Sequence, residues 1–185
     1  MPPTLNPLKR LIPWRFQTSN SEKLYGAIVA QARLPSFYQS LEIPDDLQGR
    51  FGLLALNLFV VLHALAAKGP DGSALAQELA NRFSKDMETV LRELGTGDLA
   101  IPKKMRELMR SSRGLLEHYQ ATLERGEAAL ADAIAATLPA KPGSEGLSSE
   151  PLASYVRESI ERVERQRLSA LAAGEVDFAE IPEPR

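Results

Sequence analysis

One segment of the chain, residues 51–67, constrains the fold more than any other. Fourteen of its 17 residues are apolar, none is charged, and only Gly52, Asn57 and His63 interrupt the run. As a helix it would be about 26 Å long, slightly shorter than the ~30 Å hydrocarbon core of a bilayer. Because the neighbouring segments are amphipathic and need a partner surface, the sequence favours a central helix buried in a bundle over a membrane span. Asn57 and His63 are then expected to be satisfied polar groups in or near the core.

Helical periodicity continues on both sides of this segment. Ser19 and Glu22 have the spacing of a capping box, and the apolar stripe that follows predicts a helix that ends before Pro35. Ser73 and Asp98 are candidate N-caps of later helices. The remaining helices are expected at residues 36–41, 73–94, 98–125, 126–138 and 151–173. The sequence therefore predicts an all-α, single-domain helical bundle of about six to seven helices around the central apolar helix.

The two ends differ in composition from this domain, which we place at residues 21–173. Residues 1–20 hold four prolines and three cations without an acidic residue, and they predict an irregular basic leader. Trp14 and its apolar neighbours either pack onto the domain or contact an anionic membrane surface. Residues 174–185 predict an acidic C-terminal tail.

Composition and motifs argue against catalysis. The chain contains no cysteine, which excludes disulfides, thiolate metal sites and cysteine nucleophiles, and its net charge of −2 argues against a protein that wraps nucleic acid. Nucleophile-elbow, P-loop, dinucleotide-binding and zinc-protease motifs are missing. His63 and His118 lack a carboxylate pattern that would support a metal site. An enzyme would rest only on unassigned polar residues such as His63 and Asp98, so we expect no reaction, no cofactor and no metal.

Two groups of charged residues remain. The first is either a solvated helix face or a contact surface for phosphate-rich RNA, anionic lipid or an acidic partner. It comprises Lys103, Lys104, Arg106, Arg110 and Arg113. Without interleaved aromatic residues, sequence-specific nucleic-acid recognition is not expected. The second group lies beside predicted turns and helix ends, where ion pairing fixes loop geometry. It comprises Asp45, Asp46, Arg50, Arg92, Glu93 and Asp98.

Three stretches of sequence, in this order and spacing, resemble one protein family. They read LYGAIVAQAR at 24–33 with Phe37 and Tyr38, IPD at 43–45 with GRF at 49–51, and LRELGTGDL at 91–99 with IPKKM at 101–105. Together they resemble the ubiquinol–cytochrome c chaperone family, bacterial relatives of the mitochondrial factor that assists cytochrome b synthesis and bc1 assembly. The resemblance spans roughly residues 22–125, and the run at 91–99 is its most specific element. Asp46 departs from the threonine expected after Pro44 and Asp45.

The resemblance implies a non-enzymatic, all-α assembly chaperone for the respiratory cytochrome bc1 complex. Its partner would be newly made cytochrome b or another bc1 assembly protein. The long N-terminal extension of the mitochondrial relatives is missing, which favours a bacterial, cytoplasmic protein, with peripheral contact to the inner membrane left open. Ribosome contact is known for the mitochondrial relatives and is not implied for a bacterial member. The alternative function is a ribosome-binding, RNA-binding or membrane-surface adaptor that uses the basic helix at 103–113.

The candidate surface for client or partner helices is an apolar groove around Tyr25, Phe37, Tyr38 and Phe51. The full candidate set for this contact is Tyr25, Arg33, Phe37, Tyr38, Asp45, Arg50, Phe51, Arg92, Glu93 and Asp98. The basic group, from Lys103 to Arg113, is the candidate site for ribosome or lipid. In the alternative interpretation the charged members and Tyr25 mainly hold the fold together.

Overall fold

Eight α-helices make up the described part of the chain, residues 19–144, 146–147 and 149–181 of a computed structural model. They are α1 (Asn20–Ala32), α2 (Pro35–Ser40), α3 (Leu47–Ala66), α4 (Gly69–Glu93), α5 (Ile101–Arg125), α6 (Glu127–Thr137), α7 (Ser149–Arg165) and α8 (Leu168–Ala172). No strand occurs in the described ranges, and the predicted all-α bundle is confirmed. The helix predicted at 151–173 is two helices, because Arg167 has extended backbone angles and separates α7 from the short α8.

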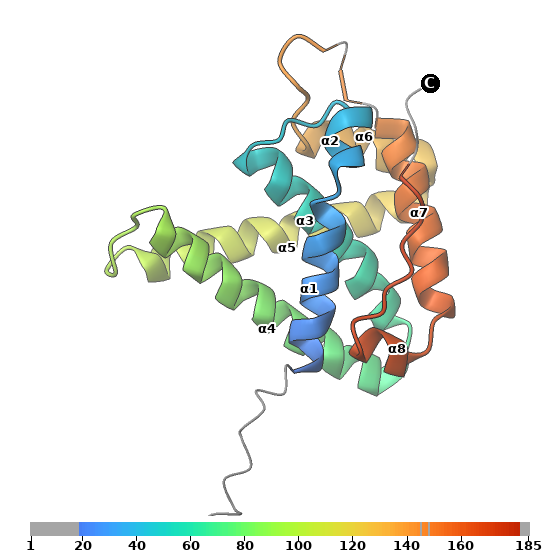
Figure 1. Cartoon of the computed structure of the whole chain (residues 1–185), viewed down its shortest axis with the longest axis horizontal. Coiled ribbons are helices and arrows are strands. Elements are labelled where there is room, and N and C mark those ends of the chain that lie inside the picture. Colours follow the sequence, from blue (N-terminus) through green and yellow to red (C-terminus); the bar gives the residue numbers. More distant parts are fainter. Residues whose placement is uncertain (1–18, 145, 148, 182–185) are drawn as a thin grey trace, which may run out of the picture.

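The apolar segment forms α3, which lies at the centre of the bundle (Figure 1). By length and composition α3 could cross a membrane, but 67% of its most apolar stretch is buried in the fold. It contacts α1, α4, α5 and α7. Asn57 is fully buried, and its amide donates to the Leu53 carbonyl at 2.9 Å and accepts from the Tyr155 hydroxyl at 2.6 Å. The prediction of a core helix with a satisfied polar residue is therefore confirmed.

The first helix begins where its capping box predicts. The Ser19 hydroxyl accepts from the Glu22 amide at 3.2 Å, and the Glu22 carboxylate accepts from the Ser19 amide at 2.9 Å. Helix α1 then packs against both α3 and α4. The predicted leader, residues 1–20, lies outside the described residues except for Ser19 and Asn20.

Helices α4 and α5, each 25 residues long, form an arm that extends beyond the bundle (Figure 1). Two expected caps are wrong. Helix α4 begins at Gly69, with Pro70 in its first turn and no side-chain cap, so Ser73 lies inside it. Helix α5 likewise begins after Ala100 without a side-chain cap, and Asp98 pairs with Arg92 instead.

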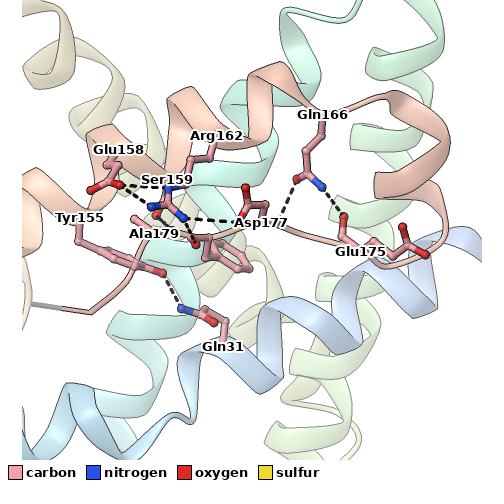
Figure 2. A network of polar contacts seen from close by, with 10 residues as sticks. Gln31, Tyr155, Glu158, Ser159, Arg162, Gln166, Glu175, Asp177 and Ala179 are labelled. Carbon is pink, nitrogen blue, oxygen red and sulfur yellow. Dashed lines mark hydrogen bonds and ion pairs between the residues drawn. The ribbon is translucent and has the colours of Figure 1, made fainter.

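The chain after α8 returns along α7 (Figure 2). The Ala179 amide donates to the Ser159 hydroxyl at 3.0 Å. Gln166 donates to the Glu175 carbonyl at 3.0 Å and accepts from the Asp177 amide at 2.9 Å. These bonds fix the tail, as far as Ala179, on the face of the bundle opposite the arm (Figure 1).

Candidate functional site

The loop before α3 is shaped by charged side chains. Asp46 caps α3, because its carboxylate accepts from the Gly49 amide at 2.8 Å. The threonine expected at this position would offer the same kind of oxygen acceptor. The Arg50 guanidinium donates to Asp45 at 2.7 Å and thereby lowers the pKa of that carboxyl. A Cβ at Gly49 would lie 2.0 Å from the Pro44 carbonyl oxygen, so the close approach of this loop to α3 requires glycine.

The predicted apolar groove around Tyr25, Phe37 and Tyr38 is not open, because all three rings are buried. Tyr25 donates its hydroxyl proton to Asp86 at 2.8 Å, and burial raises the pKa of the Tyr25 phenol. Phe37 packs edge-on against Tyr155, with ring centroids 5.3 Å apart. These aromatic residues hold α1, α2, α4 and α7 together, and only the edge of Tyr38 reaches an open groove.

An open apolar groove of about 740 Å³ lies instead between α3, α4, α5 and α6, and we call it the main groove. Phe51 is the one member of the predicted aromatic set that lines it. Leu47 and Leu94 stand at its edge with 58% and 60% of their surface exposed. Its full lining is Leu47, Gln48, Phe51, Gly52, Met87, Val90, Leu91, Leu94, Leu108, Leu115, Ala136, Thr137, Leu138 and Pro139. Only Gln48 and Thr137 contribute polar side chains.

A smaller groove of about 390 Å³ continues from the main groove on the α1 side of α4, and we call it the side groove. The two grooves share Leu47, Phe51, Met87, Val90 and Leu94. Four charged residues lie around the side groove, namely Arg33, Arg50, Asp86 and Glu93. An apolar floor inside a charged rim is the arrangement found where amphipathic helices dock. Three predicted charged candidates, Arg33, Arg50 and Glu93, are thus brought together.

Four of the six predicted charged residues form two separate pairs, whereas Asp46 caps α3 and Glu93 lines the side groove. Asp45 and Arg50 form one at the start of α3, and Arg92 and Asp98 form the other at the end of the arm, with an N–O distance of 2.5 Å. Arg92 also contacts Glu88 at 2.9 Å. No ion pair joins the two sites within the described residues. Each pair fixes a loop, which is the structural role predicted for this group.

The basic group lies along α5, and all five cations are exposed. Four of them have the spacing that places residues along one side of a helix, and we call these the basic stripe. The basic stripe comprises Lys103, Arg106, Arg110 and Arg113. Lys104 lies beside it and donates to the Thr96 hydroxyl at 3.2 Å. In the part of the chain that the structure describes, none of the five pairs with a carboxylate.

The histidines do not form a common site. His63 Nδ1 lies 2.7 Å from the Gln120 amide oxygen, and its Nε2 lies 3.6 Å from Glu164. His118 is exposed on α5. Among residues 19–144, 146–147 and 149–181, no group of three or more acidic or histidine side chains could hold a metal ion.

Phe51 on α3 was a predicted contact residue, but the groove residues on α4 and α5 were visible in the sequence only as core positions. The spacing of Leu91, Leu94, Leu108 and Leu115 predicts one inward face on each helix, and the structure partly buries all of them except Leu94, which is 60% exposed. That face becomes a groove because α4 and α5 have 25 residues against 20 in α3. The apolar stripe of α4 and α5 therefore extends beyond the end of the helix that covers it.

Comparisons with known proteins agree with this fold. Residues 39–178 match the family model of the ubiquinol-cytochrome C chaperones, a range that contains the whole lining of the main groove. The crystal structure of the Cbp3 homolog from Brucella abortus is similar, with 32% identity and a TM-score of 0.77, and the match covers 94% of this chain and 97% of that one. A search among curated proteins found no match.

Proposed function

This chain belongs to the ubiquinol-cytochrome C chaperone family, and from that premise we propose that it is a non-catalytic assembly factor of the bc1 complex that holds an apolar helix of newly made cytochrome b. The main groove carries the proposal. It is open, it is lined almost entirely by apolar side chains, and the matched range contains its whole lining. The client helix would lie along α4 and α5, against the part of their apolar faces that the bundle leaves uncovered.

The groove fits one face of such a helix. An α-helix is about 10–12 Å wide with its side chains, so a groove of about 740 Å³ accepts anchor residues spaced at i, i+3 or i+4, and i+7 rather than a whole helix. A helix destined for a bilayer exposes apolar side chains to water until it is inserted. Binding would cover both that surface and the exposed leucines Leu47 and Leu94, which favours association.

The polar groups around the grooves support holding rather than chemistry. Gln48 and Thr137 are the polar side chains of the main groove, and they do not make a nucleophile and base. Arg33 and Glu93 at the side groove offer both signs of charge to polar residues at the end of a client helix. Such a surface binds a segment and releases it unchanged.

The test introduces a carboxylate into the groove without disturbing the core. Leu47→Asp changes an exposed residue of both grooves, and Leu34→Asp is the matched control, because Leu34 is 39% exposed and lies on neither groove. An unpaired carboxylate facing an apolar helix should weaken client binding at least about tenfold. Pull-down of newly made cytochrome b and the amount of assembled, haem-loaded bc1 complex in membranes measure the effect.

A photo-crosslinking residue at position 91, on the groove, should capture cytochrome b, and the same residue at position 34 should not. Normal cytochrome b capture and assembly with Leu47→Asp would show that the client binds elsewhere. A deletion strain with normal levels of assembled bc1 complex would refute the proposed function itself.

A further inference from the structure

The end of the α4–α5 arm combines a fully exposed leucine with a row of unpaired cations. The turn at residues 94–100 joins the two helices at the point farthest along the arm (Figure 1). Leu99 in this turn is 100% exposed, the largest exposure among the large apolar residues of the described chain. It lines neither groove. The client site proposed above therefore does not account for it.

Hydrogen bonds within the turn fix its backbone conformation, and this conformation places Leu99 in solvent. The Thr96 amide donates to the Leu91 carbonyl at 3.1 Å, and the Ala100 amide donates to the Gly97 carbonyl at 2.8 Å. The Arg92–Asp98 ion pair ties the turn to the end of α4. Leu99 therefore projects into solvent from a fixed turn and does not pack against the helices.

The charge of this region differs from that of the whole chain. Residues 99–113 carry five cations and a single carboxylate, although the net charge of the protein is −2. The basic stripe begins at Lys103, in the first turn of α5, and Leu99 lies four residues earlier in the turn that precedes this helix, so the exposed leucine and the first cations are close along the chain. The opposite side of α5 carries the partly buried Leu108 and the buried Ser112. The basic stripe can therefore contact another surface while the opposite side of α5 stays packed within the arm.

We propose that this end of the arm docks on an anionic lipid bilayer, with Leu99 inserted among the acyl chains and the basic stripe on the headgroup phosphates. Apolar insertion beside lysine and arginine is how peripheral helices bind anionic membranes. RNA fits less well, because residues 99–113 contain no aromatic side chain for base stacking and a protruding leucine gains nothing from a phosphate backbone. This surface is separate from the main groove and does not depend on the proposed client.

Flotation of the full-length protein with vesicles tests the binding. Vesicles of equal parts phosphatidylcholine and phosphatidylglycerol should bind the protein, vesicles of phosphatidylcholine alone should not, and added salt should weaken binding. Lys103→Gln with Arg106→Gln should reduce binding about twenty- to thirtyfold, and Leu99→Ser about tenfold or more. Lys85→Gln with Arg167→Gln removes the same charge from exposed sites elsewhere and should have little effect.

A second measurement separates lipid insertion from general attraction to polyanions. Leu99→Trp in a Trp14→Phe background should show a blue-shifted emission that acyl-chain bromine quenches, and Leu34→Trp in the same background should not. Unchanged vesicle binding by the Leu99 and Lys103/Arg106 variants would overturn the proposal. So would a protein whose binding depends on the cations but not on Leu99 and which RNA displaces, since that result identifies a nucleic-acid surface.

Discussion

Replacing Tyr155 with phenylalanine should destabilise the protein through Asn57, a residue on another helix. The Tyr155 hydroxyl donates to the side-chain oxygen of Asn57 at 2.6 Å. It also accepts from the Gln31 amide at 3.1 Å, a contact that Figure 2 shows. Asn57 is fully buried on α3, whereas Gln31 on α1 is partly exposed. One hydroxyl thus joins α7 to both helices.

The magnitude follows from the groups that lose a partner. Phenylalanine keeps the aromatic ring, so the cost comes from the oxygen of Asn57, which becomes a buried acceptor without a donor. An unsatisfied buried acceptor lowers the free energy of unfolding by about 1–3 kcal/mol. The loss of the Gln31 contact adds little to this cost, because the Gln31 amide can hydrogen-bond to water instead. Asn57→Leu should cost a similar amount, because it leaves the Tyr155 hydroxyl without its buried acceptor. In the double variant neither unsatisfied group remains, so its cost should fall short of the sum of the single costs by about 1–3 kcal/mol.

Urea unfolding followed by far-ultraviolet circular dichroism measures all four free energies of unfolding. Tryptophan fluorescence is a poor probe, since the single tryptophan, Trp14, lies outside the described residues. The denaturant slope should stay constant across the four proteins, which shows that the same surface unfolds in each. Costs that add within about 0.5 kcal/mol would refute the reasoning, because they would mean that lost packing, not an unpaired polar group, sets the penalty.

Three further predictions concern contacts that stabilise the bundle. Gly72→Ala should lower the free energy of unfolding, measured by thermal unfolding, by about 1–3 kcal/mol, because the new Cβ would lie 2.3 Å from the Leu65 carbonyl oxygen of α3. Gly114→Ala is the control, because its Cβ would meet open space, and it should be neutral or slightly stabilising. Burial raises the pKa of Tyr119 to about 12, so its contribution of about 3 kcal/mol should be complete below pH 10 and decline as the pH rises from 10 towards 12. Tyr119→Phe should reduce this slope without abolishing it, because burial also raises the pKa of Tyr25 and Tyr155. Ser159→Ala should speed hydrogen exchange at the Ala179 amide while the global unfolding free energy falls by about 1 kcal/mol.

Helices whose sequence is compatible with only one environment, or with only one start, were predicted correctly. Because α3 is apolar on all sides, it is stable in a folded protein when it is buried, and the capping box at Ser19 marks the start of α1. The start of α4 was predicted four residues too late because Ser73 was interpreted as its N-cap, although a helix with proline in its first turn, here Pro70, needs no side-chain cap. The break at Arg167 has no local signal, since neither glycine nor proline stands there.

The candidate site shows a more general reason for error. Periodicity identifies the face of a helix that is apolar, but it does not say whether the fold provides something to cover it. Tyr25 and Phe37 were taken for an open surface and are covered, whereas Leu91 and Leu115 were taken for core and line a groove. Deciding between the two requires the relative lengths and positions of packed helices, which depend on contacts between segments far apart in the chain.

The arm assigns its two proposed roles to different sides of the same helices. On α5, Leu108 and Leu115 face the main groove, while Arg106 and Arg110 follow the exposed stripe that begins beyond Leu99. If both proposals hold, a helix in the groove lies along α5 while α5 lies along the membrane surface, so the client would be held parallel to the bilayer that it must enter. The roles also separate physically, because the groove contact is apolar and insensitive to salt, whereas the stripe acts through charge and weakens as ionic strength rises. Because the groove and the stripe lie on opposite sides of α5, a client released from the groove would then be one helix diameter, about 10–12 Å, from the headgroups.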